Sequence, residues 1–99
     1  MIIYFADRKM NILGKASTNL PDGLVITQDK KTEDIETGVA TFECTIPYHK
    51  EMRRKLKEWT AVGNYILRKN EDENEFYTII ESEADTKNQE VFLYAEDAG

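Results

Sequence analysis

The sequence predicts an α+β fold that is mainly β, with a curled antiparallel sheet or small barrel of about six to seven strands and one amphipathic helix. Apolar and polar residues alternate over 39–48, as in a strand with one buried face. Over 49–62 the apolar residues recur at helical spacing, and Gly63 follows where a helix commonly ends. Polar connections of about five residues separate the last three predicted strands, which favours consecutive antiparallel hairpins.

The N-terminal segment predicts two paired strands. Apolar side chains point both ways along Met1–Ala6, so a strand there needs cover on both faces, as in a barrel or a tight sandwich. Asp7–Asn11 is a polar turn, and Ile12–Ala16 returns antiparallel to the first strand. Gly14 lies inside this second strand, where glycine often marks a bulge.

A turn, a short strand and a charged segment come next. Residues 20–23 read Leu-Pro-Asp-Gly, with proline and glycine at positions that a β-turn favours. We expect a strand over 24–27. Gln28–Thr37 holds six charged residues and one apolar residue, Ile35, so it predicts a long, solvated and mobile loop.

The centre of the chain predicts a strand, a helix that covers the sheet, and three more strands. One face of the strand over 39–48 collects Ala40, Phe42, Cys44, Ile46 and Tyr48. The apolar stripe of the helix over 49–62 collects Met52, Leu56, Trp59 and Val62. The later strands are expected at Asn64–Lys69, Glu75–Ser82 and Glu90–Ala95.

Length and charge restrict the function classes. The 99 residues fit one domain, 1–99, and because Glu96–Gly99 directly follows a strand we expect a longer natural chain. The net charge is −6, yet residues 49–58 carry five bases against two acids. An acidic body with one basic segment argues against nucleic acid as the main partner. No apolar run approaches the length of a membrane-spanning helix and no signal-peptide pattern opens the chain, so no membrane partner is expected.

Candidate catalytic residues are scattered. His49 is the one histidine, and no nucleophile or acid is placed by spacing to complete a triad or metal site with it, so solvation in the first helical turn is the favoured interpretation. Cys44 shares its strand face with apolar residues, which favours core packing with a raised pKa over nucleophilic chemistry.

The acidic and aromatic clusters also have structural explanations. The run Glu71, Asp72, Glu73 and Glu75 lacks the glycine turn of a calcium loop, so a charged hairpin tip is favoured, and no metal or cofactor is predicted. Glu81 with Glu83 cannot be told from the solvent face of a strand. The ten aromatic residues are favoured as core over a stacking platform for sugars or bases.

One exposed feature is unusual: a basic ridge on the polar face of the predicted helix. Two interpretations of it stand side by side. Helical pairs such as Glu51 with Lys55 and Arg54 with Glu58 would make it an ordinary solvated face. Alternatively, it meets an acidic surface on another subunit, where charge complementarity sets orientation. The ridge comprises Lys50, Arg53, Arg54 and Lys57.

Five ordered stretches carry a resemblance to a known family. They are Met1–Lys9, Asn19–Leu24, Thr41–Tyr48, Val62–Leu67 and Phe76–Ile80, and they extend over nearly the whole chain. Together they resemble the start of phage minor structural proteins, the prophage tail-endopeptidase or tail-associated-lysin proteins of long-tailed phages that infect Gram-positive bacteria. The resemblance consists of ordered strand patterns rather than a catalytic motif.

The resemblance implies a virion component near the tail tip, made in the cytoplasm of the bacterial host. In that family the N-terminal region is similar to the first domain of the baseplate hub, a β-rich module that helps to build a threefold ring between the distal tail ring and the tip. Peptidase or cell-wall-degrading activity belongs to later regions, so the resemblance carries no catalytic residue onto these positions.

Two functional hypotheses follow. The first is a structural assembly module of a phage tail tip or baseplate hub that contacts other tail proteins and copies of itself, as a trimer by resemblance. The second is a small β-barrel binding module for glycan or single-stranded nucleic acid, with exposed aromatic residues beside the ridge. An enzyme ranks third, because no nucleophile, base and orienting group are grouped in the sequence.

Overall fold

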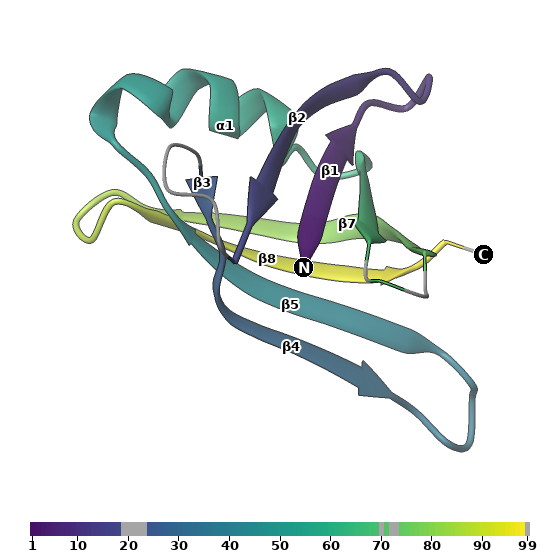
Figure 1. Cartoon of the computed structure of the whole chain (residues 1–99). Coiled ribbons are helices and arrows are strands. Elements are labelled where there is room, and N and C mark those ends of the chain that lie inside the picture. Colours follow the sequence, from purple (N-terminus) through teal and green to yellow (C-terminus); the bar gives the residue numbers. More distant parts are fainter. Residues whose placement is uncertain (19–23, 70, 72–73, 99) are drawn as a thin grey trace.

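The computed structural model describes residues 1–18, 24–69, 71 and 74–98, which form one curled β-sheet covered by a short helix (Figure 1). The predicted turn over 20–23 lies outside the described residues. The strands are β1 (Ile2–Ala6), β2 (Ile12–Ser17), β3 (Leu24–Val25), β4 (Thr27–Glu33), β5 (Ala40–Pro47), β6 (Tyr65–Lys69), β7 (Asn74–Asp85) and β8 (Glu90–Asp97). A 3₁₀ turn, η1 (Lys50–Met52), leads into the helix α1 (Arg53–Trp59). The predicted fold class is confirmed, with eight strands in place of six to seven.

The strand order is β3-β2-β1-β6-β7-β8-β5-β4, and β2 with β3 is the one parallel pair in the described sheet. The last three strands form the consecutive hairpins that the sequence predicts. The sheet curls until β3 packs near β5, so that the sheet is a nearly closed barrel. In Figure 1 the long strands β4, β5, β7 and β8 lie below β1, β2 and α1.

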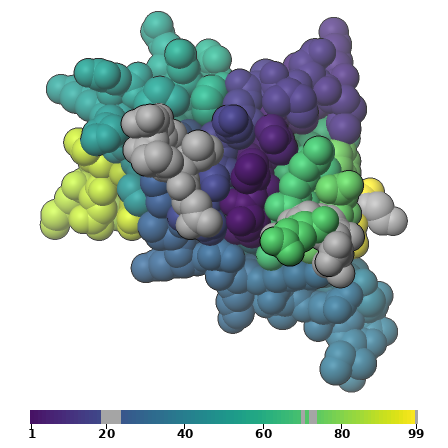
Figure 2. All heavy atoms as spheres, viewed as in Figure 1, coloured from purple at the N-terminus to yellow at the C-terminus, as the bar shows by residue number. Residues whose placement is uncertain are grey.

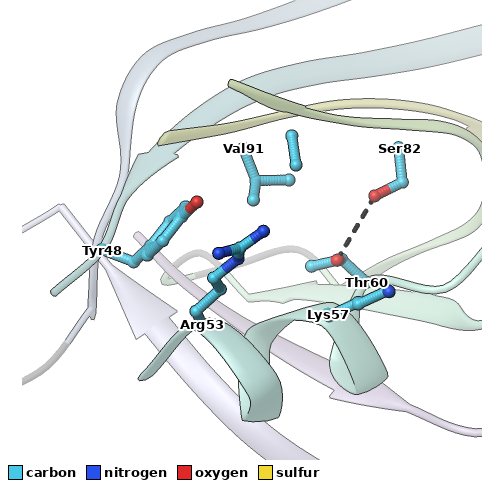
Figure 3. Close-up of a pocket in the computed structure, with 7 residues that line it drawn as sticks. Tyr48, Arg53, Lys57, Thr60, Ser82 and Val91 are labelled. Carbon is cyan, nitrogen blue, oxygen red and sulfur yellow. Dashed lines mark hydrogen bonds between the residues drawn. The ribbon is translucent and has the colours of Figure 1, made fainter. Parts of the chain in front are cut away.

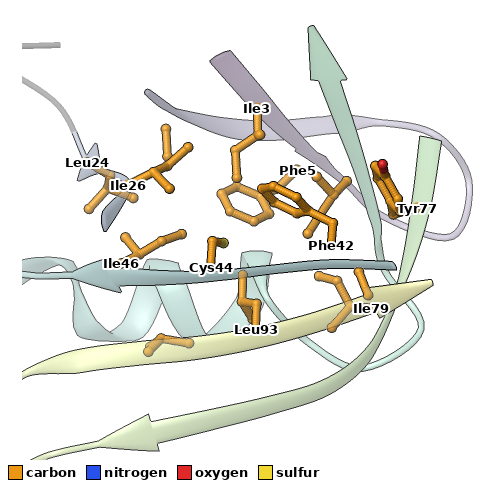
Figure 4. Packing of buried hydrophobic residues seen from close by; sticks show 14 of the residues in the cluster. Ile3, Phe5, Leu24, Ile26, Phe42, Cys44, Ile46, Tyr77, Ile79 and Leu93 are labelled. Carbon is orange, nitrogen blue, oxygen red and sulfur yellow. The ribbon is translucent and has the colours of Figure 1, made fainter. Parts of the chain in front are cut away.

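The inner face of the curled sheet holds the core (Figure 4). All five apolar residues predicted on one face of β5 are buried, from Ala40 to Tyr48. Ile3 and Phe5 of β1 and Leu93 of β8 are also fully buried and point toward the same interior. Burying apolar area in this interior is the main force that holds the sheet in its curled form.

The two faces of β1 differ, because the inner face is fully covered and the outer face, where Ala6 is buried and Tyr4 half-buried, is covered only in part. Ile3 and Phe5 are fully buried, whereas Ile2 on the opposite face is 36% exposed. Tyr4 on that outer face is half-buried, with the Lys69 ammonium 5.6 Å from its ring centroid. The predicted irregularity at Gly14 is confirmed, because the register of β1 with β2 shifts beside the Phe5–Gly14 pair.

The charged segment Gln28–Thr37 is not a long loop, and this is the largest correction to the sequence-based fold. Most of it belongs to β4, which pairs antiparallel with β5 at the edge of the sheet. Six of the seven residues of β4 are exposed. The strand therefore has no buried face, and its sequence lacks the alternation of apolar and polar residues that predicts a strand. Its backbone hydrogen bonds to β5 hold it in place instead.

The helix is shorter than predicted, and Val62 does not belong to its apolar stripe. Leu56 is fully buried and Met52 and Trp59 pack against the core, but Val62 is 55% exposed. The α-helix ends at Trp59 because side chains satisfy its last carbonyl groups: the Thr60 hydroxyl donates to Leu56 O (2.7 Å), and the Asn64 amide donates to Glu58 O (3.0 Å). Gly63 has the expected positive φ, +94°, in the turn that leads to β6.

Candidate protein interface

The basic ridge is exposed along its whole length. Lys50 lies in η1 and the other three cations lie in α1, and all four residues are exposed. With Glu51, the four side chains surround an open depression of about 410 Å³. The predicted accessible cationic surface is therefore present.

The ridge cations form no ion pair with any carboxylate of the described residues. The two ion pairs in that part of the chain, Lys31 with Glu75 and Arg68 with Glu75, are both remote from the helix. Neither of the helical pairs considered from the sequence, Glu51 with Lys55 or Arg54 with Glu58, is among them. With respect to the described carboxylates, the ridge cations therefore remain without an ion-pair partner, on a chain whose net charge is −6.

A second hollow of about 190 Å³ opens beside the ridge, between α1 and the β7–β8 hairpin (Figure 3). Arg53 and Lys57 belong to both the ridge and this hollow. Its other lining residues come from β7, β8, the end of the helix and the residue that follows β5: Ser82, Ala84, Val91, Thr60 and Tyr48. The sequence analysis missed this hollow, because its lining residues are up to 43 positions apart and become neighbours only when the sheet curls.

The hollow combines an apolar wall with cationic and hydroxyl groups. Val91 and the Tyr48 ring supply the apolar wall, and both residues are buried in the single chain. The Ser82 hydroxyl donates to Thr60 Oγ1 (3.3 Å), and the Thr60 hydroxyl donates in turn to Leu56 O. Arg53 extends from the helix toward Tyr48 and Val91, and together with Lys57 it offers cationic groups to an incoming anion.

A partly buried charged cluster, which the sequence does not reveal, lies among β4, β6 and β7. Arg68 and Glu75 face one another across β6 and β7, and the ammonium of Lys31 reaches the Glu75 carboxylate from β4 (2.9 Å). The Tyr77 hydroxyl donates to the same carboxylate, and the Arg68 guanidinium lies 5.5 Å from the centroid of the Phe42 ring. This cluster ties the edge strand β4 to β6 and β7, so its role is structural.

The electrostatics of the cluster follow from its position. Burial acts to raise the pKa of Glu75, but the hydrogen bonds from Tyr77 and Lys31 and the charges of Arg68 and Lys31 outweigh it and hold that pKa below its ordinary value. Burial, followed by the hydrogen bond to Glu75, raises the pKa of Tyr77. Glu75 is therefore a charged acceptor at neutral pH and Tyr77 a neutral donor.

The remaining candidates do not converge on a site. Cys44 is fully buried, and burial raises its pKa to about 12, as expected for a core thiol. His49 is exposed just before η1, and Glu81 and Glu83 are exposed on β7. Among residues 1–18, 24–69, 71 and 74–98, no three His, Cys, Asp or Glu side chains are grouped to hold a metal ion. Asp72 and Glu73 of the acidic run lie outside the described residues, and Glu75 belongs to the charged cluster.

The aromatic residues divide between the core and the outer face of the sheet. Phe5, Phe42, Tyr48 and Tyr77 are buried, in line with the core assignment. Tyr65 and Phe76 instead stack on the outer face with ring centroids 5.0 Å apart, and both are half-buried. Part of the aromatic set therefore remains accessible.

No protein-family model matches the chain, and no curated protein is significantly similar to it. In the described part of the chain, neither helical segment has the length and apolar composition of a membrane span.

Proposed function

We propose that this chain is a protein–protein assembly module that docks through its basic ridge. The exposed charge of Lys50, Arg53, Arg54 and Lys57 is the observation that carries the proposal. The four exposed cations form no ion pairs with the described residues of their own chain. An acidic surface on a partner would form such pairs and fix the orientation of docking. The adjoining hollow offers such a partner an apolar contact as well.

The resemblance to phage minor structural proteins supplies the context of this proposal. The module would belong to a phage tail tip or baseplate hub and contact the distal tail ring, the tip and copies of itself, as a trimer in the full-length protein. It would be made in the host cytoplasm and reside in the virion. We assign it assembly and no catalysis; peptidase or lysin activity would belong to later regions of the full-length protein.

Charge reversal tests the ridge. The triple variant Arg53→Glu, Arg54→Glu and Lys57→Glu should prevent the full-length protein from entering phage tails and should lower its oligomeric mass in sedimentation. The three side chains are exposed, so the fold should survive, and circular dichroism checks this. A matched control reverses three exposed lysines away from the ridge, Lys9, Lys15 and Lys87. Normal tails and an unchanged mass for the ridge variant would contradict the proposal.

The stacked pair Tyr65–Phe76 favours a second candidate, a β-barrel module that binds glycan or single-stranded nucleic acid. Register places Tyr4, Leu67 and Phe76 in one row across β1, β6 and β7 on the same outer face. Titration with cell-wall fragments and oligonucleotides separates the two candidates. Tight, saturable binding that is lost in Phe76→Ala would favour this second function over assembly.

A further inference from the structure

The tip of the β4–β5 hairpin carries an exposed apolar side chain within an acidic setting. Ile35 is 98% exposed, and Glu33, Asp34 and Glu36 surround it in the sequence. The next most exposed large apolar residue of the described chain, Ile12, is 58% exposed. An isoleucine this exposed gains no burial free energy in the single chain and would gain it on contact with a partner.

The tip is held in a defined conformation. Asp34 Oδ1 accepts hydrogen bonds from the backbone N–H groups of Glu36 (2.9 Å) and Thr37 (3.4 Å). The Gly38 N–H donates to Asp34 O (2.8 Å), and Gly38 has a φ of +72° that suits this turn. A preorganised tip loses little conformational entropy on binding.

The hollow beside the ridge is complementary to this tip in both polarity and charge. Its apolar wall of Val91 and Tyr48 matches the isoleucine, and its rim cations Arg53 and Lys57 match the flanking acids. Its volume of about 190 Å³ suits one aliphatic side chain and a neighbouring carboxylate. The hairpin tip is therefore complementary to the hollow as a projection is to its binding pocket.

One chain cannot make this contact with itself. The molecule is 41 Å long, and the hairpin tip projects from the end of the molecule remote from α1 (Figures 1 and 2). Each chain instead presents the projection at one end and the receptor at the other, which is the arrangement of a head-to-tail contact between copies.

We propose that the β4–β5 tip of one copy inserts into the hollow of the next copy, with Ile35 against Val91 and Tyr48 and the flanking carboxylates against Arg53 and Lys57. This inference rests on the proposed assembly function and names a second copy of the chain as the partner at the hollow. Such a contact is heterologous, so it closes a ring when the rotation between copies allows and otherwise extends a row.

Site-directed cross-linking tests the contact. A mixture of an Ile35→Cys variant and an Ala84→Cys variant at about 1 mM each should yield a disulfide-linked dimer at least tenfold above either variant alone, because Ala84 lines the hollow. The native Cys44 is fully buried and does not compete. The control pairs Ile35→Cys with Lys15→Cys, an exposed position on β2. An equal yield from the control pair overturns the inference.

Substitution at the tip supplies the second measurement. Ile35→Ser leaves the fold intact, because its side chain touches nothing, and should weaken self-association at least tenfold in sedimentation. Glu36→Arg combined with Arg53→Glu in one chain should restore the self-association that either change alone weakens, because the Glu36 side chain takes no part in the hydrogen bonds of the tip. If the ridge reversal blocks tail assembly while Ile35→Ser and the cross-link have no effect, the self-contact is rejected and the assembly function stands.

Discussion

Glu75→Gln tests the charged cluster that holds the edge strand on the barrel. In the native protein one carboxylate accepts from Arg68, Lys31 and Tyr77, which come from three different strands. Glutamine keeps the shape of the side chain and one acceptor oxygen but removes the negative charge. The substitution therefore removes the negative charge that Arg68 and Lys31 share.

The magnitude follows from the exposure of the partners. The Arg68 and Glu75 side chains are each 14% exposed, so their pair is only partly buried and removal of one partner costs no more than the lower end of the about 3–5 kcal/mol found for fully buried pairs. Lys31 is 35% exposed and can turn to water, so its pair contributes less than about 1 kcal/mol. We expect the free energy of unfolding to fall by about 3 kcal/mol, a large part of the 5–15 kcal/mol typical of a domain.

Urea unfolding at several pH values measures this difference. The pKa of Glu75 is lower in the folded state than its ordinary value near 4.5, so its stabilising effect is complete above that value. The effect declines as the pH falls through the folded-state pKa, because the protonated carboxyl no longer differs in charge from glutamine. The gap between native protein and variant should therefore be full at pH 7 and shrink at acidic pH.

A matched control is Glu83→Gln on the same strand, where the side chain is exposed and forms no ion pair among the described residues. It should change the free energy of unfolding by less than about 0.5 kcal/mol. A Glu75→Gln variant as stable as this control at pH 7, or a gap that stays constant from pH 7 to pH 3, would refute the reasoning.

Two further predictions concern the core. In Gly14→Ala the new methyl group would lie 2.4 Å from the ring of Trp59, the one tryptophan. The substitution should therefore lower the free energy of unfolding by about 1–3 kcal/mol and shift the fluorescence of Trp59. An unchanged spectrum would show that the ring does not cover Gly14. Cys44, whose pKa is raised to about 12, should react with a thiol reagent at pH 8 at least about 100-fold more slowly in the folded chain than in urea, and equal rates would place the thiol outside the core.

The elements that bury one face were predictable from the sequence, and those that bury none were not. β5 shows its alternation because every second residue enters the core, and Leu56 and Trp59 reveal the helix in the same way. β4 is an edge strand with an almost wholly exposed surface, so its composition is that of a loop. The local sequence pattern cannot distinguish such an edge strand from a solvated loop.

The functional surface divides in the same manner. The ridge could be predicted because its four cations lie within eight consecutive residues of one helical segment. The hollow and the Glu75 cluster could not, because Tyr48 and Val91, or Lys31 and Glu75, meet only through pairings between distant strands. The end of the helix also escaped prediction, since Thr60 and Asn64 end it through hydrogen bonds to its carbonyl groups.

The position of β8 constrains how the chain acquires its structure. β8 is the last strand in sequence, yet it lies between β7 and β5 and joins the β4–β5 hairpin to the rest of the sheet. A nascent chain that has emerged only as far as β7 has no partner for the free edge of β5. We therefore expect the barrel to form after synthesis has passed Asp97, and to fold slowly for its size because its decisive pairings span long stretches of sequence.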